Sequence, residues 1–364
     1  MKLFEETTIG EMKVKNRIVM PAMQLALGLT NKRARVYYME RAKGGVGTII
    51  MSGTSVDLLN EDESWGRKGA VAKLKKEMKA FTTQVHRQKA KIGIQLWHGN
   101  QIPAGAGMPI PGAKPVAPSA GNGMKKLTIK EIQSIIDKFA LASKNAKDYG
   151  LDFIQLHGAH GYLLCQFFSG ADNKRTDKYG GSLQKRMTMG IEVVEAVRDA
   201  VGKNYPISYR LGAQEDIPGG VTLSQAKKFA VELEKAGVDF FDISLGKNLK
   251  RGASPTKRAN MGTFADLAAG IRSVVNVPVM AVGRINTGKV ARAILKEKKA
   301  DLVGVARQLI TDPQWPNKVQ QRKEKSIEAC ISCNTCFTPI RSRKWRPGDQ
   351  ICKVNANAGR EIDI

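Results

Sequence analysis

The chain has few histidines, few aromatic residues and no long apolar run. Only 4 of its 364 residues are histidine, and Phe, Trp and Tyr together make up 6%. No apolar run approaches the roughly 18 residues that a membrane-spanning helix needs. Residues 1–10 also lack the apolar core of a signal peptide. We therefore expect no membrane span and a cytoplasmic location.

Acidic side chains are scarce as well, with 33 Asp and Glu against 59 Lys and Arg, for a formal net charge of +26. Such a charge raises the question of anionic partners, among them nucleic acid, CoA thioesters and an acidic electron-transfer protein. The basic stretches at 73–79 and 295–300 lie among apolar residues in helix-like patterns, as solvated helix faces do. No basic stripe is interleaved with aromatic residues. We expect no nucleic-acid binding.

Eight short apolar runs alternate with helical segments, which indicates a parallel α/β fold. The runs are 17–22, 46–53, 91–97, 152–158, 206–212, 239–246, 278–284 and 301–307. Signals for the start and end of helices lie between them, as in the capping box Thr128-x-x-Glu131, which precedes a 3.6-residue apolar pattern ending at Gly150.

Eight strands are the number that closes a (β/α)8 TIM barrel. We predict an α/β barrel over residues 1–325 and a small C-terminal cysteine-rich segment over 326–364. A doubly wound open sheet is the alternative, but no G-x-G-x-x-G turn follows the first strand.

In such a barrel the chemistry lies at the C-terminal ends of the strands, because all eight βα loops meet there. The strand ends carry Met23, Gln24, Gly53, Gln95, His98, His157, His160, Arg210, Gly283, Arg284 and Arg307. Two arginines and a glycine on the last two strands suggest a phosphate-bearing cofactor.

The stretch at 156–186 closely resembles the signature of the old yellow enzyme family, the NADH:flavin oxidoreductases that include FMN-dependent ene reductases; it reads LHGAHGYLLCQFFSGADNKRTDKYGGSLQKR. Further family motifs follow in family order: NRIVMPAM, IGIQLWHG, PVAPSA, GGVTLSQA, PVMAVGRI and LVGVARQLITDP. The resemblance covers essentially the whole chain and implies a flavoprotein with this barrel fold.

The resemblance implies a bound FMN and assigns residues to it by position. The flavin would be lined by Pro21, Ala22, Met23, Gln24, Gly53 and His157; Gln95 would bond its pyrimidine ring; Arg210 would lie near N1 and O2; Gly283, Arg284, Ala306 and Arg307 would hold the phosphate. A cation at Arg210 suits the negative charge that a reduced flavin gathers around N1. Gln24 stands where the trimethylamine dehydrogenase branch attaches its flavin through cysteine, so we expect no covalent link.

His157 and His160, spaced i, i+3 at a strand end, can point two imidazole donors at one carbonyl oxygen. They would polarise an α,β-unsaturated carbonyl, either an enone or an enoyl thioester, for hydride from flavin N5. The resemblance implies that Tyr162 supplies the proton to Cα. The alternative is a pair of core histidines with a packing tyrosine, which is the usual reading of a lone histidine.

Four of the five cysteines gather near the C-terminus, as Cys330, Cys333 and Cys336 in C-x2-C-x2-C spacing and Cys352 after a further fifteen residues. This pattern suits four thiolates around a [4Fe-4S] cluster or a structural zinc ion. The resemblance to the larger branch of the family, which includes dienoyl-CoA reductases and bile-acid enone reductases, implies the iron–sulfur cluster. Cys165 is expected to be a packing residue.

In that branch the chain continues into domains that bind FAD and NAD(P)H, whereas this sequence ends at Ile364. We expect a short form, a truncated chain or one subunit of a larger assembly. The electron donor would be NAD(P)H, a ferredoxin, a reductase partner or the missing domain, and a homo-oligomer stays open. Two alternatives to ene reduction are oxidative amine demethylation on the same fold and an electron-transfer flavoprotein subunit without catalysis.

Overall fold

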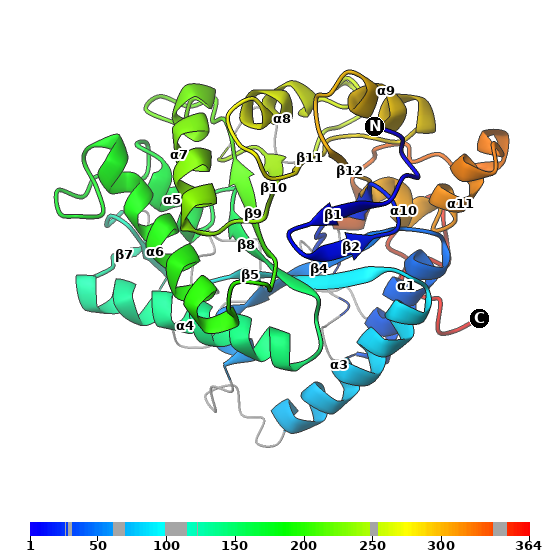
Figure 1. Ribbon diagram of the computed structural model, residues 1–364, viewed down its shortest axis with the longest axis horizontal. Coiled ribbons are helices and arrows are strands. Elements are labelled where there is room, and N and C mark those ends of the chain that lie inside the picture. Colours follow the sequence, from blue (N-terminus) through cyan, green and yellow to red (C-terminus); the bar gives the residue numbers. More distant parts are fainter. Residues whose placement is uncertain are drawn as a thin grey trace.

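The computed structural model of the chain contains a closed barrel of eight parallel strands, in the order β10-β11-β12-β3-β4-β5-β8-β9 (Figure 1). The structure describes residues 1–25, 27, 31–60, 70–98, 115–121, 123–247, 254–337 and 348–364. The barrel strands are β3 (Ile18–Met20), β4 (Thr48–Ser55), β5 (Lys91–Trp97), β8 (Phe153–Gly158), β9 (Ile207–Gly212), β10 (Phe240–Ser244), β11 (Val279–Ala281) and β12 (Leu302–Gly304). All eight apolar runs are therefore strands, and the predicted (β/α)8 barrel is confirmed.

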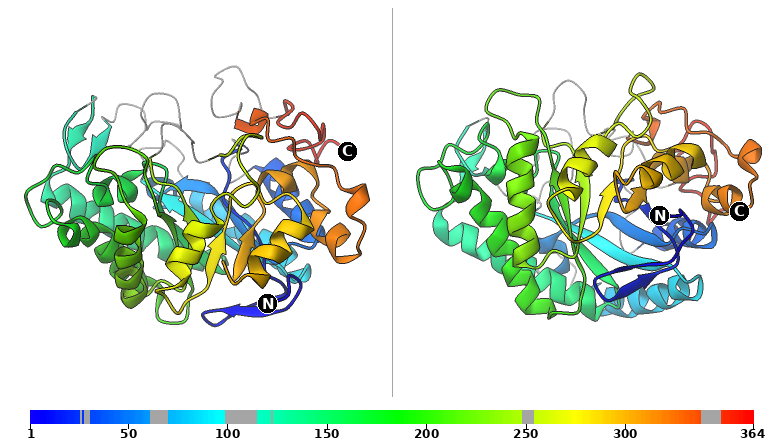
Figure 2. Two further views of the ribbon diagram at one scale, coloured as in Figure 1. Left: turned by 90° about the horizontal axis from the view of Figure 1, so that it is seen from above. Right: turned by 45° about the horizontal axis from the view of Figure 1, so that its top comes forward.

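Helices surround the barrel; α1 to α9 lie between successive barrel strands in the sequence, and α10 and α11 follow the last strand, β12 (Figures 1 and 2). They are α1 (Lys32–Lys43), α2 (Val56–Leu59), α3 (Ala70–Arg87), α4 (Ile129–Asp148), α5 (Leu163–Phe168), α6 (Leu183–Val201), α7 (Leu223–Ala236), α8 (Ala265–Arg272), α9 (Gly288–Lys296), α10 (Arg307–Thr311) and α11 (Trp315–Gln320). Short 3-10 turns follow at Glu324–Ser326 and Thr335–Phe337, and two short strands, β6 (Val116–Ala117) and β7 (Lys125–Lys126), pair outside the barrel. No helix among the described residues has both the length and the apolar character of a bilayer span.

The helix boundaries follow from side-chain capping. At the start of α4 the Thr128 side chain accepts from the Glu131 N–H while the Glu131 carboxylate accepts from the Thr128 N–H. The same reciprocal pair forms between Thr222 and Gln225 at α7. Each box satisfies two of the backbone N–H groups that a helix start leaves unpaired. The predicted capping box is therefore present.

An N-terminal hairpin covers the amino ends of the barrel strands. It consists of β1 (Thr7–Ile9) and β2 (Met12–Val14), whose side chains Ile9, Met12 and Val14 are buried in one apolar cluster with Phe153 and Phe240. Phe153 and Phe240 are the first residues of β8 and β10, so the cluster lies at the start of the strands. In Figure 2 (left) the hairpin lies at the bottom, and the C-terminal segments lie toward the opposite side.

The C-terminal residues 348–364 are attached to α1 by a buried ion pair. The Arg41 side chain is 0% exposed and pairs with Glu361, which is 7% exposed. Arg41 also donates to the backbone oxygens of Leu309 (2.9 Å) and Tyr37 (2.8 Å), and its guanidinium lies 3.5 Å from the Tyr37 ring centroid. This one arginine therefore joins α1, α10 and the C-terminal residues. The division of the chain into a barrel over 1–325 and a cysteine-rich segment over 326–364 stays a prediction.

Removing Glu361 leaves the Arg41 charge buried without its carboxylate, which typically costs about 3 kcal/mol or more. We expect Glu361→Ala to lower the free energy of unfolding by about that amount, measured by urea titration. The neighbouring pair of Arg33 and Asp363 is more exposed, at 17% and 42%, so Asp363→Ala should cost about 1 kcal/mol or less. Equal losses for the two variants would contradict a special role for the buried pair.

Candidate functional site

The carboxyl ends of the barrel strands bring the predicted site residues to one face of the molecule. Residues 21–24 directly follow β3, Gly53 lies in β4, Gln95 in β5, His157 in β8, Arg210 in β9, and Gly283, Arg284, Ala306 and Arg307 follow β11 and β12. These positions come from seven of the eight barrel strands. The roles of these residues toward a cofactor stay predictions, but the fold places them at a common mouth.

Three side chains from the end of β8 and the turn that follows it form a compact group at this mouth. The His157 ring centroid lies 5.0 Å from that of His160 and 4.6 Å from that of Tyr162. His160 has a positive φ of 59° and its N–H donates to the Leu245 carbonyl at 3.1 Å, so the loop after β10 holds the turn. Tyr162 then directly precedes α5, and its ring lies tilted against that of Trp97 of β5, with 5.1 Å between the ring centroids. The sequence HGAHGY therefore folds into one cluster of two imidazoles and a phenol.

Burial keeps both imidazoles neutral. Desolvation, with the positive charge of Arg210 as a second cause, lowers the pKa of His157 and of His160 well below the usual value near 6.5. His160 Nε2 lies 2.8 Å from the Ser244 hydroxyl. The buried Nδ1 of His157 has no hydrogen-bond partner in the described part of the chain. A neutral imidazole still has one N–H to donate, so both rings can bind a carbonyl oxygen.

The Tyr162 phenol keeps its proton at neutral pH. Burial raises its pKa above the ordinary value of 10, and the Arg210 charge only partly opposes that rise. A protonated phenol beside two neutral imidazoles is a proton donor next to two hydrogen-bond donors. Cys165, one turn further along α5, is buried as expected and contacts Glu215.

The residues after β3 and on β4 line the mouth through backbone groups. The Ala22 carbonyl accepts from Arg210 Nη1 at 3.2 Å, and the Gly53 carbonyl accepts from Gln24 Nε2 at 3.4 Å. A Cβ at Gly53 would lie 3.1 Å from Gln95 Oε1, so glycine keeps the surface open beside that amide. Gln24 thus bridges β3 and β4 through its amide, where a cysteine would offer a thiol.

A buried polar network connects Gln95 with Arg210 inside the barrel. Gln95 donates to Gln155 (2.7 Å), Gln155 donates to Asp242 (3.4 Å), and Arg210 Nε lies 3.2 Å from the Asp242 carboxylate, without hydrogen-bond alignment. Burial raises the pKa of Asp242, and the Arg210 charge opposes that rise. The network therefore sets a carboxylate beside the buried cation at the mouth.

Sequence reasoning missed Gln155 and Asp242. Both lie two residues before a strand-end residue, Gln155 before His157 and Asp242 before Ser244. Side chains alternate between the two faces of a strand, so these residues point to the same side as the strand-end group. Polar residues at this period within apolar strands were the available signal.

The loops after β11 and β12 hold two arginines. Gly283 has a φ of 104°, and a Cβ there would lie 2.8 Å from Phe264, so this turn requires glycine. The next residue, Arg284, donates to Ser332 Oγ (3.3 Å) and to the Ala259 carbonyl. Arg307 donates to Asn334 Oδ1 and, at 2.7 Å, to the Pro255 carbonyl.

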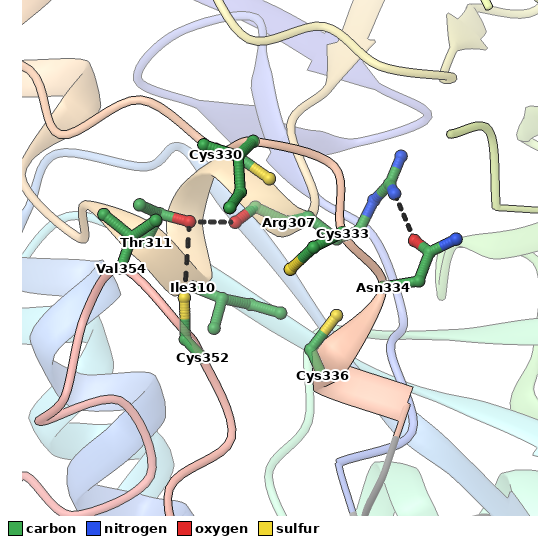
Figure 3. A pocket seen from close by; sticks show the side chains of 10 residues that line it. Arg307, Ile310, Thr311, Cys330, Cys333, Asn334, Cys336, Cys352 and Val354 are labelled. Atoms are coloured by element: carbon green, nitrogen blue, oxygen red, sulfur yellow. Dashed lines mark hydrogen bonds between the residues drawn. The ribbon is translucent and has the colours of Figure 1, made fainter. Parts of the chain in front are cut away.

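The four C-terminal cysteines line a single pocket next to Arg307 (Figure 3). Its walls are Arg307, Ile310, Thr311, Cys330, Ile331, Cys333, Asn334, Cys336, Cys352 and Val354. Burial raises the pKa of the Cys336 thiol to about 12, with Arg307 opposing that rise. No three His, Cys, Asp or Glu side chains among the described residues are grouped to hold a single metal ion. Four thiols around one pocket are nevertheless the donor type that an iron–sulfur cluster uses, each thiolate binding its own iron.

The buried histidines predict a loss of stability in mild acid. Their folded-state pKa is lowered, so the unfolded chain takes up protons that the folded chain refuses once the pH falls below about 6.5. Each such group then costs up to about 1.4 kcal/mol per pH unit. We expect the urea midpoint to fall between pH 7.5 and 5.5, and to fall less in His157→Gln. If the urea midpoint of that variant fell with pH as steeply as in the wild type, His157 would be protonated in the folded chain at pH 5.5.

Comparisons with known proteins identify the family of the chain. Residues 2–326 match the model of the NADH:flavin oxidoreductase / NADH oxidase family. NADH oxidase of Thermoanaerobacter brockii is 40% identical over 379 residues, covering 99% of this chain and 56% of that protein. NADPH dehydrogenase of Clostridium acetobutylicum is 37% identical over 346 residues, covering 90% of this chain and 97% of that protein.

Among solved structures, 2-naphthoyl-CoA reductase in complex with 2-naphthoyl-CoA is similar, with a TM-score of 0.86 and 27% identity. The match covers 100% of this chain and 58% of the reductase. The chain thus spans a little over half the length of this reductase and of the Thermoanaerobacter NADH oxidase. On the family match and these relatives, the chain belongs to the NADH:flavin oxidoreductase / NADH oxidase family.

Proposed function

We propose that the chain binds FMN across the carboxyl face of the barrel and reduces the C=C bond of an enone or an enoyl thioester. The observation that carries this proposal is the group of His157, His160 and Tyr162, in which two neutral imidazoles lie against a protonated phenol. Reduction of an activated alkene needs hydrogen-bond donors that polarise the substrate carbonyl and a proton donor beside them, and this group offers both.

The residues around the mouth fit a flavin. The Arg210 guanidinium suits the negative charge of a reduced isoalloxazine, and the Gln95 amide can pair with its pyrimidine edge. Gly53 leaves room for a flat ring, since a Cβ there would crowd Gln95 and Trp97. At the other end, Arg284 and Arg307 present two cations for the phosphate, next to the φ-positive turn at Gly283.

Substrate binding follows from the protonation states. His157 and His160 are neutral, so each donates one N–H to the carbonyl oxygen of the substrate and stabilises the negative charge that develops there. FMN held by these residues would supply the hydride for the alkene β-carbon. Tyr162 delivers its phenolic proton to the α-carbon, which its raised pKa keeps available at neutral pH.

The related NADH oxidase and NADPH dehydrogenase support a nicotinamide nucleotide as the reductant, and the similarity to 2-naphthoyl-CoA reductase supports a CoA thioester as one substrate class. A second entry for electrons is a [4Fe-4S] cluster on Cys330, Cys333, Cys336 and Cys352, which line one pocket. Through that cluster a ferredoxin, a reductase partner or a further domain would serve as donor. We expect substrate identity to depend on the loops at 101–123 and 246–262, of which residues 101–114, 122 and 248–253 lie outside the described part of the chain.

The proposed roles are separable in the two half-reactions. We expect Tyr162→Phe to leave anaerobic flavin reduction by NADH or NADPH nearly unchanged and to slow reoxidation by 2-cyclohexenone about 100-fold, since general acids contribute roughly that much. Stopped-flow absorbance of the flavin measures both rates. Tyr179→Phe is the control, because its hydroxyl bonds Glu192 away from the mouth.

Equal slowing of both half-reactions by Tyr162→Phe would contradict the proton-donor role. A purified chain that binds no flavin would overturn the proposed function as a whole. A bound flavin that neither nucleotide reduces would instead move the electron entry to the cysteine pocket.

The cysteine pocket predicts about four iron atoms and four sulfides per chain after anaerobic purification. Cys336→Ser should remove most of both, while Cys165→Ala should remove neither, since Cys165 is buried in α5. Colorimetric iron and sulfide assays measure this. One zinc ion per chain in place of iron would show that the pocket is a structural zinc site.

A further inference from the structure

The segment that carries the first three cysteines is hydrogen-bonded to the two arginines assigned to the flavin phosphate. Ser332 accepts from Arg284 Nε at 3.3 Å, and Asn334 accepts from Arg307 Nη1. Ser332 lies between Cys330 and Cys333 in the sequence, and Asn334 lies directly after Cys333. The spacer residues of the cysteine motif thus contact the arginines, and Figure 3 shows Asn334 beside Arg307 at the pocket that the cysteines line.

The backbone of this segment is built to make those contacts. Ser332 and Asn334 have positive φ values of 55° and 62°, a conformation that costs free energy for a residue with a side chain. The segment is also attached on both sides, because the Cys330 N–H donates to Gln308 Oε1 at 2.9 Å and the Asn334 amide donates to the Ser254 carbonyl at 3.2 Å. Contacts with α10 and with Ser254 therefore help to hold these turns.

The contacts orient the arginines without neutralising them. In four hydrogen bonds Arg284 and Arg307 donate to a hydroxyl, an amide oxygen and two backbone carbonyls, all of them uncharged. Both guanidinium groups thus keep their positive charge for an anion. Arg307 also lines the cysteine pocket, so the same cation faces the cluster thiolates on one side.

We propose that Ser332 and Asn334 are positioning residues that couple the binding of the FMN phosphate by Arg284 and Arg307 to the metal-loaded state of the cysteine motif. When a metal centre fixes the three cysteines, Ser332 and Asn334 hold Arg284 and Arg307 in the orientation that binds the FMN phosphate. Loss of the centre frees the segment and the two arginines lose that orientation. By linkage, bound FMN must stabilise the metal centre by the same factor. This inference rests on the proposed function, which places the phosphate at these arginines.

The test measures FMN affinity in the full chain with and without its metal centre. Anaerobically purified protein is freed of flavin, and FMN fluorescence quenching gives the Kd. We expect Asn334→Ala and Ser332→Ala each to raise the Kd about tenfold in the metal-loaded protein. Controls are Asn276→Ala and Ser326→Ala, which replace exposed residues on other elements.

The wild-type chain tests the coupling without any substitution. Removal of the centre by an anaerobic iron chelator should raise the Kd for FMN about tenfold, and Asn334→Ala should add little to the Kd of that metal-free protein. In the reverse direction, saturating FMN should slow the loss of iron to the chelator in the wild type and much less in Asn334→Ala. If Asn334 only supported the fold, Asn334→Ala would raise the Kd for FMN by the same factor in the metal-loaded and in the metal-free protein.

Further variants separate this inference from the proposed function. If Arg307→Ala and Arg284→Ala leave the Kd for FMN unchanged, the phosphate site is wrong and the coupling with it, whereas a chain that binds no FMN overturns the proposed function itself. If they raise the Kd strongly while Ser332→Ala, Asn334→Ala and metal removal leave it unchanged, the coupling is wrong and the flavin site stands. A metal-free wild type that binds FMN as tightly as the loaded protein likewise overturns the coupling.

Discussion

The parallel closure of the barrel is the constraint on which the rest of the structure depends. Every strand runs in the same direction, so every carboxyl end opens on one face, whatever the distance between strands in the sequence. Residues as far apart as Ala22 and Arg210 are in hydrogen-bond contact for this reason. The hydrogen bonds between strands thus decide which side chains share the mouth, and local sequence decides only what each position contributes.

Water exclusion then determines the charge of each group at the mouth. The same burial that lowers the pKa of the two imidazoles raises the pKa of Tyr162 and of Asp242, because each charged form loses its hydration. Arg210 is the fixed cation of this group, and the carboxylate of Asp242, its register partner on β10, lies 3.2 Å from its Nε. The site therefore keeps three proton-bearing or proton-donating groups uncharged around one permanent positive charge.

The strands and the HGAHGY cluster were predictable, since both are local patterns: apolar runs of strand length, and polar residues that follow them directly. Gln155 and Asp242 were not found, because their importance depends on neighbours from other strands. Ser332 and Asn334 were missed for a different reason. They stand between cysteines, which dominate the motif, and their partners Arg284 and Arg307 lie 48 and 27 residues away in the sequence. Which spacer side chain meets which arginine depends on positive φ angles that the sequence does not show for non-glycine residues.

The β1–β2 hairpin has a consequence for the order of events in the proposed reaction. The amino end of the barrel is filled by Ile9, Met12 and Val14, which pack against Phe153 and Phe240. Substrates would therefore enter and leave at the carboxyl face. A nicotinamide ring and an alkene that must each lie against the same flavin face would then bind one after the other at the same site. Steady-state kinetics of that kind are ping-pong, with each substrate at high concentration acting as a competitive inhibitor of the other.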